Sequence, residues 1–203
     1  MRFRSVLLGR SVGSLASPHP KGDEETVRVI AGTYRGRRLV APKGAATRPT
    51  GDRVREALFS ILGPIDDASV LDLYAGSGAL GLEALSRGAR RCVFADVDGG
   101  ACRAIKTNLA TLGITGALVL QRDALSVLRD EAHAHRVHAL VMLDPPYGEW
   151  ERLEERLTLA LPAVVADGGR VVVETAAKVE PTLPLDLVTT RRYGSARITI
   201  FTP

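Results

Sequence analysis

The chain has 203 residues, enough for one medium-sized domain with a sizeable hydrophobic core. Its residues are 45% hydrophobic and 25% charged, which is typical of a globular protein and excludes collagen, coiled coil and wholesale disorder. The longest stretch without a formal charge, residues 107–121, contains Asn, Thr, Gly and Gln, so we expect no membrane span. With only Cys92 and Cys102, a disulfide framework and a four-cysteine zinc site are excluded, and a cytoplasmic location is expected.

Positive charge is concentrated near the amino terminus. Residues 26–55 carry a net charge of +7, whereas the whole chain carries +4, so a basic segment is joined to a mildly acidic body. Such clustering indicates a phosphate-rich partner. The alternative is a solvated basic loop without a partner.

The first 25 residues show no sustained periodicity. Their apolar run, Val6–Leu8, is much too short for the hydrophobic part of a signal peptide. The Ser, Pro, Gly and acidic residues that follow predict a disordered leader over residues 1–25. A mis-assigned upstream start is an equally good interpretation of this segment.

A short extension is expected next, over residues 26–62. Two strand-like runs, Val27–Ala31 and Arg38–Val40, predict a hairpin around a glycine-containing turn. Apolar residues at helical spacing then predict a helix, with Thr50 or Asp52 as its N-cap.

Residues 63–203 alternate between strand and helix patterns and form the expected main domain. The predicted strands are Val70–Ala75, Cys92–Val97, Ala117–Gln121, Ala139–Leu143, Arg170–Glu174, Leu185–Thr190 and Ala196–Phe201. The predicted helices are Leu80–Arg87, Ala101–Leu112, Ala124–Ala134 and Trp150–Leu161. Nearly continuous apolar strands predict a parallel sheet covered by helices on both faces. The last two strands are separated by five residues, too few for a parallel crossover, so this pair is expected to be antiparallel.

A glycine-rich turn follows the first strand of the main domain. Gly76, Gly78 and Gly81 have the GxGxxG spacing between a strand and a helix, where backbone N–H groups can approach a ligand. The pattern fits a dinucleotide and S-adenosylmethionine (SAM) equally. Asp72 favours SAM, because a carboxylate at this strand end repels a pyrophosphate and suits a cationic amino acid group.

Two more carboxylates follow the neighbouring strands. Asp96 is expected to accept hydrogen bonds from ribose hydroxyls, and Asp123 from the adenine amino group. The alternative for Asp72, Asp96 and Asp123 is that they cap helices. The residues expected to bind the cofactor are Asp72, Tyr74, Gly76, Ser77, Gly78, Asp96, Val97, Asp123 and Ala124.

The tetrapeptide Asp144-Pro-Pro-Tyr147 follows the fourth strand, where two prolines stop the ladder and stiffen the turn. The Asp144 carboxylate and the Pro145 carbonyl can accept both hydrogens of an exocyclic base amine and favour its pyramidal, reactive form. Tyr147 can stack on the base and align it. Asp144, Pro145 and Tyr147 are therefore the expected catalytic residues. The alternative is a simple Asp-Pro turn.

Histidine and cysteine spacing predicts no metal site. His133, His135 and His138 lack the i, i+4 spacing of a helical metal pair. Cys92 and Cys102 have no activating base nearby in the sequence and are expected to be buried apolar residues.

Residues 144–147 resemble the (D/N)PP(Y/F) signature of amino-group methyltransferases, and residues 72–81 resemble their SAM loop. The segments 28–38, 47–59 and 71–89 are similar to the RsmD family, and the resemblance covers about residues 27–202. It implies SAM-dependent methylation of the exocyclic N2 of guanine 966 in bacterial 16S rRNA, within the small ribosomal subunit or its assembly intermediate. It also implies the class I methyltransferase fold: an α/β, Rossmann-like, seven-stranded sheet with an antiparallel last strand, preceded by a small β-hairpin and helix.

The resemblance also gives the basic segment a role in holding rRNA. The residues expected to bind RNA are Arg35, Arg37, Arg38 and Lys43 on phosphates, and Arg48, Arg53 and Arg55 nearer the cofactor. The alternative for Arg53 is that it and Glu56 pair with the body of the protein and have no role in RNA binding. A monomer without metal or membrane association is expected. The sequence departs from the family pattern in the leader and at Gly99-Gly100, a flexible helix start on the ribose side of the pocket.

Three other functions fit parts of the pattern. Adenine-N6 methylation of DNA or RNA uses the same amine chemistry. An NAD-dependent dehydrogenase would share the glycine loop, but Asp72 and the lack of a catalytic His or Tyr-Lys pair disfavour it. A non-catalytic rRNA-binding assembly factor fits the basic segment and leaves Asp144–Tyr147 without a role.

Overall fold

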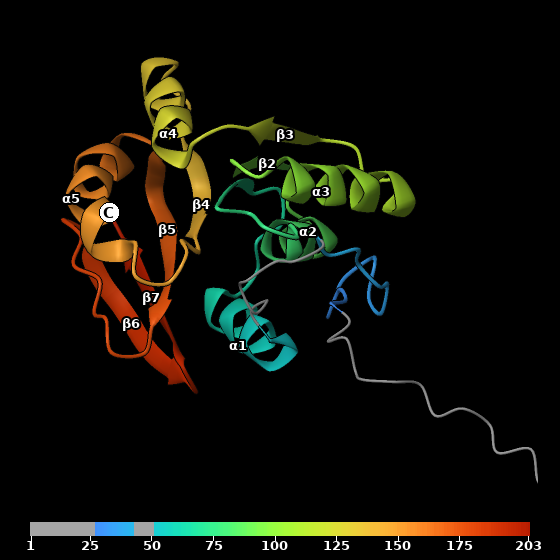
Figure 1. Ribbon diagram of the computed structural model, residues 1–203, viewed down its shortest axis with the longest axis horizontal. Coiled ribbons are helices and arrows are strands. Elements are labelled where there is room, and N and C mark those ends of the chain that lie inside the picture. Colours follow the sequence, from blue (N-terminus) through green and yellow to red (C-terminus); the bar gives the residue numbers. More distant parts are fainter. Residues whose placement is uncertain (1–26, 43–50) are drawn as a thin grey trace, which may run out of the picture.

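The computed structural model describes residues 27–42 and 51–203, which are built around one seven-stranded sheet (Figure 1). The strands are β1 (Ser69–Leu73), β2 (Arg91–Asp96), β3 (Ala117–Gln121), β4 (His138–Leu143), β5 (Val165–Ala176), β6 (Asp186–Tyr193) and β7 (Ala196–Thr202). The helices are α1 (Asp52–Leu62), α2 (Ala79–Ser86), α3 (Gly99–Leu112), α4 (Ala124–His133) and α5 (Trp150–Ala160), followed by a short 3-10 turn, Leu161–Ala163.

The strand order is β3-β2-β1-β4-β5-β7-β6. The five strands β1 to β5 are parallel to one another, and β7 is antiparallel to both β5 and β6. The predicted class I methyltransferase fold and the antiparallel final pair are therefore confirmed. Every predicted strand and helix of the main domain is present, and β5 extends well beyond the predicted Arg170–Glu174.

Alternating side chains of the central strands build two cores, one on each face of the sheet. Val70, Leu140 and Val172 pack with α1, α2 and α3 on one face. Leu71 and Val141 pack with α4 and α5 on the other. Burial on both faces explains why these strands have almost no polar residues until they reach the sheet edge.

The amino-terminal extension packs against α2 and α3. Residues 27–39 form a hairpin-like turn with a single bridge, Arg28 to Arg38, in place of the two predicted strands. Val27, Val29 and Leu39 are buried in the α1–α3 core.

Two buried polar side chains hold this turn in place. The Glu83 carboxylate on α2 accepts from the backbone N–H groups of Ile30 at 2.7 Å and Ala31 at 3.0 Å. The Asn108 amide on α3 exchanges two hydrogen bonds with the Val40 backbone. The extension is therefore part of the same globular unit as the sheet.

The predicted N-cap of α1 needs correction. The capping position is Gly51, which has no side chain to accept a hydrogen bond, and Asp52 is the first helical residue. The Asp52 carboxylate instead pairs with Arg28 and Arg55, at 2.8 and 2.9 Å, because both guanidinium groups lie beside the first turn. The other predicted cap, Thr50, and the predicted leader, residues 1–25, lie outside the described residues.

A buried polar network closes the amino ends of β1 and β4. The Arg91 guanidinium donates to Ser69 Oγ at 2.8 Å, and Ser69 Oγ lies 3.0 Å from His138 Nδ1. His138 Nε2 lies 3.1 Å from Glu131 Oε2. Since the Glu131 carboxylate can only accept, Nε2–H of His138 donates to it, and Nδ1 accepts from the Ser69 hydroxyl.

The pKa values in this network follow from burial and pairing. Burial lowers the pKa of His138, and this effect outweighs its hydrogen bond to Glu131. Burial alone would raise the pKa of Glu131, but hydrogen bonds from Arg136 and His138 bring that pKa below its ordinary value. The network therefore holds a neutral imidazole beside an ionised, well-paired carboxylate.

Neither a membrane span nor a metal site is found in residues 27–42 and 51–203. No helix there is long and apolar enough to cross a bilayer. Nor does any group of three or more His, Cys, Asp or Glu side chains gather there as metal ligands would. Both cysteines are buried.

Candidate active site

Three carboxylates lie at the carboxyl ends of the adjacent strands β1, β4 and β5: Asp72, Asp144 and Glu174. The strand register aligns Leu73 with Leu143 and Leu143 with Val173. The side chains of Leu73, Leu143 and Val173 all face the α4–α5 core. Asp72 and Glu174 are each one residue away from this row, so both face the side of the sheet that α1, α2 and α3 cover. Asp144 follows Leu143 directly, and its carboxylate lies close enough to the other two to feel their charge.

Asp72 is a buried acid without a cationic partner in the described part of the chain. It is 1% exposed, and its Oδ2 accepts from the backbone N–H of Gly81 at 2.9 Å, in the first turn of α2. Burial raises the pKa of Asp72 to about 8. The alternative role of Asp72, capping a helix, is therefore observed, but it uses only one of the two carboxylate oxygens. An ammonium group of a ligand would supply the missing positive charge.

The glycine loop after β1 has an unusual backbone. Tyr74, Gly76 and Gly78 all have φ in the left-handed region, at 60°, 53° and 77°. For a tyrosine this conformation costs about 1–3 kcal/mol and is typical of ligand-binding turns. A Cβ added at Gly76 would meet only the Tyr74 carbonyl oxygen at 4.0 Å, so the loop leaves space in front of it.

Gly81 has a different role from Gly76. A Cβ at Gly81 would lie 2.3 Å from the Phe94 ring, so this glycine allows α2 to pack against β2. The GxGxxG spacing therefore combines one glycine that leaves room for a ligand with one that is required for packing.

Asp96 is oriented by the loop at the end of β2. Its Oδ2 accepts from the backbone N–H of Gly76 at 2.8 Å, and its Oδ1 accepts from that of Asp98 at 2.8 Å. The carboxylate thus lies beside the glycine loop, as a ribose-binding acid requires. Asp98 caps α3 by accepting from Gly100 and Ala101, which fixes the Gly99-Gly100 helix start.

Asp123 takes the capping role that the sequence left open. Its Oδ1 accepts from the backbone N–H and the hydroxyl of Ser126, at 3.0 and 3.2 Å, in the first turn of α4. Asp123 is exposed, so a contact with adenine stays a prediction. Of the neighbouring predicted contacts, Val97 is exposed and Ala124 is buried.

Tyr74 places a buried polar atom at this rim. Its hydroxyl is buried and has no hydrogen-bond partner among residues 27–42 and 51–203. Burial and the nearby Asp123 carboxylate raise the pKa of Tyr74 to about 12, so the phenol is neutral and can donate. Together with Asp72, Asp96 and the open Gly76, this donor fits a ligand with a cationic group, a diol and a heterocycle.

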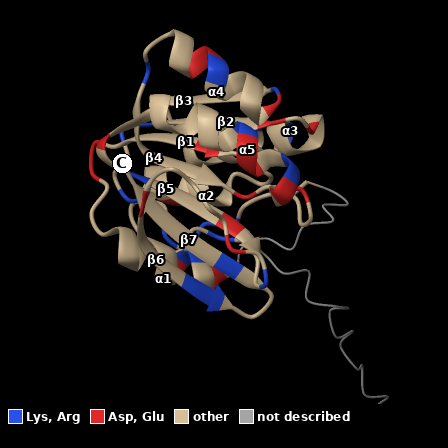
Figure 2. Cartoon of the chain, turned by 90° about the vertical axis from the view of Figure 1, so that its left-hand side faces the viewer, with Lys and Arg blue, Asp and Glu red and all other residues tan. Residues whose placement is uncertain are grey.

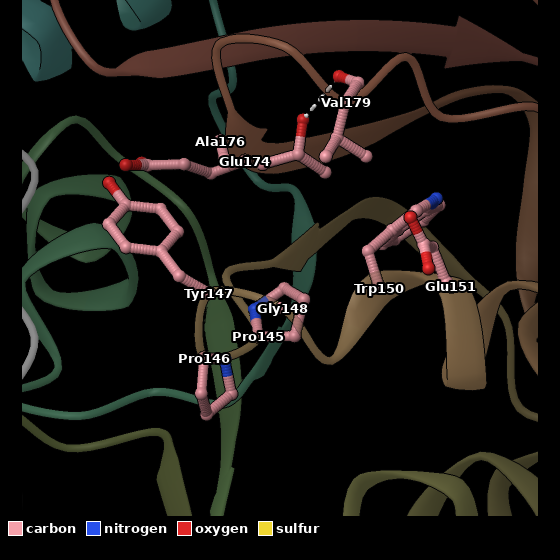
Figure 3. Close-up of a pocket in the computed structure, with 10 residues that line it drawn as sticks. Pro145, Pro146, Tyr147, Gly148, Trp150, Glu151, Glu174, Ala176 and Val179 are labelled. Atoms are coloured by element: carbon pink, nitrogen blue, oxygen red, sulfur yellow. Dashed lines mark hydrogen bonds between the residues drawn. The ribbon is translucent and has the colours of Figure 1, made fainter.

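The residues that follow Asp144 line a pocket of about 100 Å³ (Figure 3). Strand β4 ends at Leu143, and the Asp144 N–H reaches the Leu73 carbonyl of β1 at 3.4 Å. Pro145 is buried, whereas Tyr147 is 52% exposed at the mouth of the pocket. The turn therefore places two prolines and an aromatic ring on the wall of one small cavity, directly after Asp144.

The electrostatics of this pocket are unusual. Burial, together with the nearby Glu174 and Asp72 carboxylates, raises the pKa of Asp144 well above its ordinary value. Glu174 is 5% exposed, and its carboxylate points to the same corner of the pocket as the Tyr147 hydroxyl (Figure 3). A ligand that donates hydrogen bonds to these acids would relieve their repulsion.

Glu174 is a site residue that is not among those predicted from the sequence. One signal was available, because Glu174 is a lone acid that follows three consecutive valines at the end of a predicted buried strand. Its membership of the site depends on β5 lying next to β4, which local sequence patterns do not reveal.

The basic residues divide into exposed and buried groups. Arg35, Arg37 and Arg38 are exposed on the amino-terminal turn, and Arg37 donates to the Thr111 carbonyl at 3.3 Å. Arg53 is exposed on α1. The predicted RNA contacts Lys43 and Arg48 fall outside the residues whose structure is described.

The prediction that Arg55 binds RNA is wrong. Its side chain is 1% exposed, and Nη2 donates to the Arg28 carbonyl at 2.6 Å and to Asp52 at 2.9 Å. Burial lowers the pKa of Arg55, although Asp52 and Glu83 oppose this effect. Arg55 thus fastens α1 to the amino-terminal turn and is inaccessible to a nucleic acid.

Comparisons with known proteins agree with this arrangement. A family described as "Conserved hypothetical protein 95" matches residues 27–202. The "Putative rRNA methyltransferase YlbH" of Bacillus subtilis is 42% identical over 181 residues, covering 86% of this chain and 98% of the relative. "Ribosomal RNA small subunit methyltransferase D" of Escherichia coli is 42% identical over 146 residues, 71% of either chain. The solved structure of "Putative methyltransferase yhhF from Escherichia coli" has a TM-score of 0.74 at 38% identity, covering 87% of this chain and 97% of the other.

Proposed function

The chain belongs to the RsmD family of SAM-dependent methyltransferases, and we propose that it methylates the exocyclic N2 of guanine 966 in 16S rRNA, within the small ribosomal subunit or its assembly intermediate. The observation that carries the proposal is that Asp72 on β1 and Asp144, directly after the paired strand β4, lie close enough for their carboxylates to interact. One acid suits a cationic ligand and the other a base amine, so the two reactants would meet at one point of the sheet edge.

The cofactor-binding residues have separable roles in this proposal. Asp72 would neutralise the ammonium group of SAM, and Asp96 would accept hydrogen bonds from its ribose hydroxyls. The left-handed turn at Gly76 would let backbone N–H groups approach the ligand. When bound, SAM supplies a methyl group activated by the positive charge on its sulfur.

The residues of the Asp144 turn would make the exocyclic amine of the base more reactive. The Asp144 carboxylate and the Pro145 carbonyl would accept the two amine hydrogens and localise the nitrogen lone pair. The methylated amine must lose one proton, and the Asp144 carboxylate would accept it. The raised pKa of Asp144 suits this task, because a more basic carboxylate binds a proton more strongly.

Access to this pocket requires the base to leave its stack, at a cost of a few kcal/mol. The exposed Tyr147 ring at the pocket mouth can recover about 1–3 kcal/mol by stacking on the base. Exposed arginines near the site support an RNA partner of this kind. Arg191 and Arg192 are near the end of β6, at the same end of the sheet as Asp144, because β7 starts beside the end of β5. Figure 2 shows basic residues at this end of β6.

The proposal is tested by mapping the methylated nucleotide. The protein is incubated with labelled SAM and small-subunit particles that lack the modification, and the rRNA is digested and analysed by mass. We expect N2-methylguanosine at one position, with fully methylated particles as the control that accepts no label. N6-methyladenosine as the product would establish the adenine alternative, and binding without methylation would establish an assembly factor.

A further inference from the structure

Glu174 is a pocket residue that the proposed mechanism does not use. It lies in the pocket with Pro145 and Tyr147, and its side chain is 5% exposed (Figure 3). Val173 pairs with Leu143 across the β4–β5 ladder, and the next residues along the chain are Glu174 and Asp144. Adjacent strands are about 4.8 Å apart, which places the two acids side by side on one face of the sheet.

Two adjacent carboxylates fit the hydrogen-bonding edge of guanine. Guanine presents two donors next to one another, the ring N1–H and the exocyclic N2 amino group. Adenine presents its N6 amino group next to N1, which is an acceptor. An ionised carboxylate only accepts hydrogen bonds, so a second acid beside Asp144 would face a donor in guanine and a lone pair in adenine.

We propose that Glu174 is the residue that selects guanine, by accepting a hydrogen bond from N1–H while Asp144 and Pro145 hold the N2 amino group. The inference rests on the proposed function and names the feature of the base that the site recognises. Glu174 is a specificity residue in this scheme and takes no part in the methyl transfer itself.

The expected selectivity is large because the interaction is buried. A site built to accept a hydrogen bond strongly rejects an analogue that lacks the donor, since the buried acceptor is then left facing another acceptor. For a single charged hydrogen bond we expect a difference of about 10²-fold in kcat/KM. Solvent cannot rescue the mismatch at a residue that is only 5% exposed.

The test compares guanine with 2-aminopurine at the methylated position of reconstituted small-subunit particles. 2-Aminopurine keeps the N2 amino group but has an acceptor in place of N1–H. The wild-type protein is expected to prefer guanine by about 10²-fold. Glu174→Gln is expected to reduce this preference below about 10-fold, because a carboxamide can turn either its oxygen or its N–H toward N1.

Glu151→Gln is the matched control. Glu151 lines the same pocket from α5, on the side away from Tyr147 (Figure 3), and its variant should keep the wild-type preference. 2-Aminopurine also lacks O6, but this loss affects every variant equally, so the change in preference reports on N1 alone. Calorimetry with SAM checks that Glu174→Gln leaves the cofactor half of the site intact.

Each outcome decides between the two proposals. If the wild-type protein methylates guanine and 2-aminopurine equally well, or Glu174→Gln keeps the full preference, Glu174 does not select the base. If the wild-type protein methylates neither particle, the proposed function itself fails. A reduced preference in Glu174→Gln with an unchanged preference in Glu151→Gln supports the assignment.

Discussion

The ionisable groups at the two ends of the central strands differ in whether they are paired within the protein. At the amino end, Glu131 and His138 are almost fully buried, and each has a hydrogen-bond partner of complementary character. At the carboxyl end, Asp72 is buried and Asp144 is half-buried, yet no Lys or Arg of the described segments forms an ion pair with either. The pKa of Glu131 is lowered, whereas the pKa values of Asp72 and Asp144 are raised.

This difference separates a structural network from a binding site. A buried charge without a partner destabilises the folded protein, so its presence indicates a partner that arrives from outside. A buried charge that is already paired has no capacity left for a ligand. Substitutions at the two ends should therefore produce opposite patterns of activity and stability.

The largest effect is expected for Asp144→Ala. Loss of the acceptor should lower the single-turnover rate of methylation by about 10²–10⁴-fold while calorimetry shows SAM binding largely unchanged. Glu131→Gln at the opposite end is the control, and its folded fraction should turn over at a near wild-type rate. A near wild-type rate in Asp144→Ala would remove this residue from the mechanism.

A smaller effect on binding is expected for Asp72→Asn. Loss of the charge that faces the ammonium group should weaken SAM binding by about 10–100-fold, measured by calorimetry. In the absence of SAM, by contrast, the variant should be more stable than wild type, with a larger free energy of unfolding. The folded-state pKa of about 8 lies above the unfolded value of 3.8, so Asp72 lowers stability progressively as the pH rises from 4 to 8.

Denaturant unfolding checks this second part of the Asp72 prediction. The variant should gain stability relative to wild type between pH 5 and pH 8 in the absence of SAM. Equal pH slopes for the two proteins would mean that Asp72 is not held neutral by burial.

The smallest effect is expected from the protonation of His138. Its folded-state pKa lies below the unfolded value of about 6.5, so the unfolded chain binds the extra proton first as the pH falls. The contribution of His138 to stability is therefore present above pH 6.5 and is lost below it. Unfolding measured from pH 7.5 to 5.5 should show this loss in wild type and a flatter profile in His138→Gln, with an identical profile as the contradicting result.

Much of the site could be predicted because its signals are local. Asp72, Gly76 and Asp96 are recognisable from a strand end, a glycine turn and the following strand end, all within 25 residues. Asp144–Tyr147 is recognisable because two prolines at the end of an apolar strand have few structural uses. The structure places these segments at the ends of neighbouring strands, as the fold class requires.

The remaining residues could not be assigned because their environment comes from distant parts of the chain. Arg55 looks like a surface cation in the sequence, but α1 and the amino-terminal turn enclose it from both sides. Glu174 joins the site only because β5 pairs with β4, some 30 residues earlier in the chain. In the sequence Asp123 resembles a cofactor-binding residue, and in the structure it caps α4. The sequence does not separate the two roles, because both place an acid at the start of this helix.

The amino-acid sequence by itself determined the order of strands and helices, the sheet type and the two loops that follow β1 and β4, because hydrophobic periodicity and turn residues act over short distances. The tertiary structure alone decided which charges are paired and which are left for a ligand. That distinction depends on the register of neighbouring strands and on desolvation, and both are set by contacts between residues far apart in the chain.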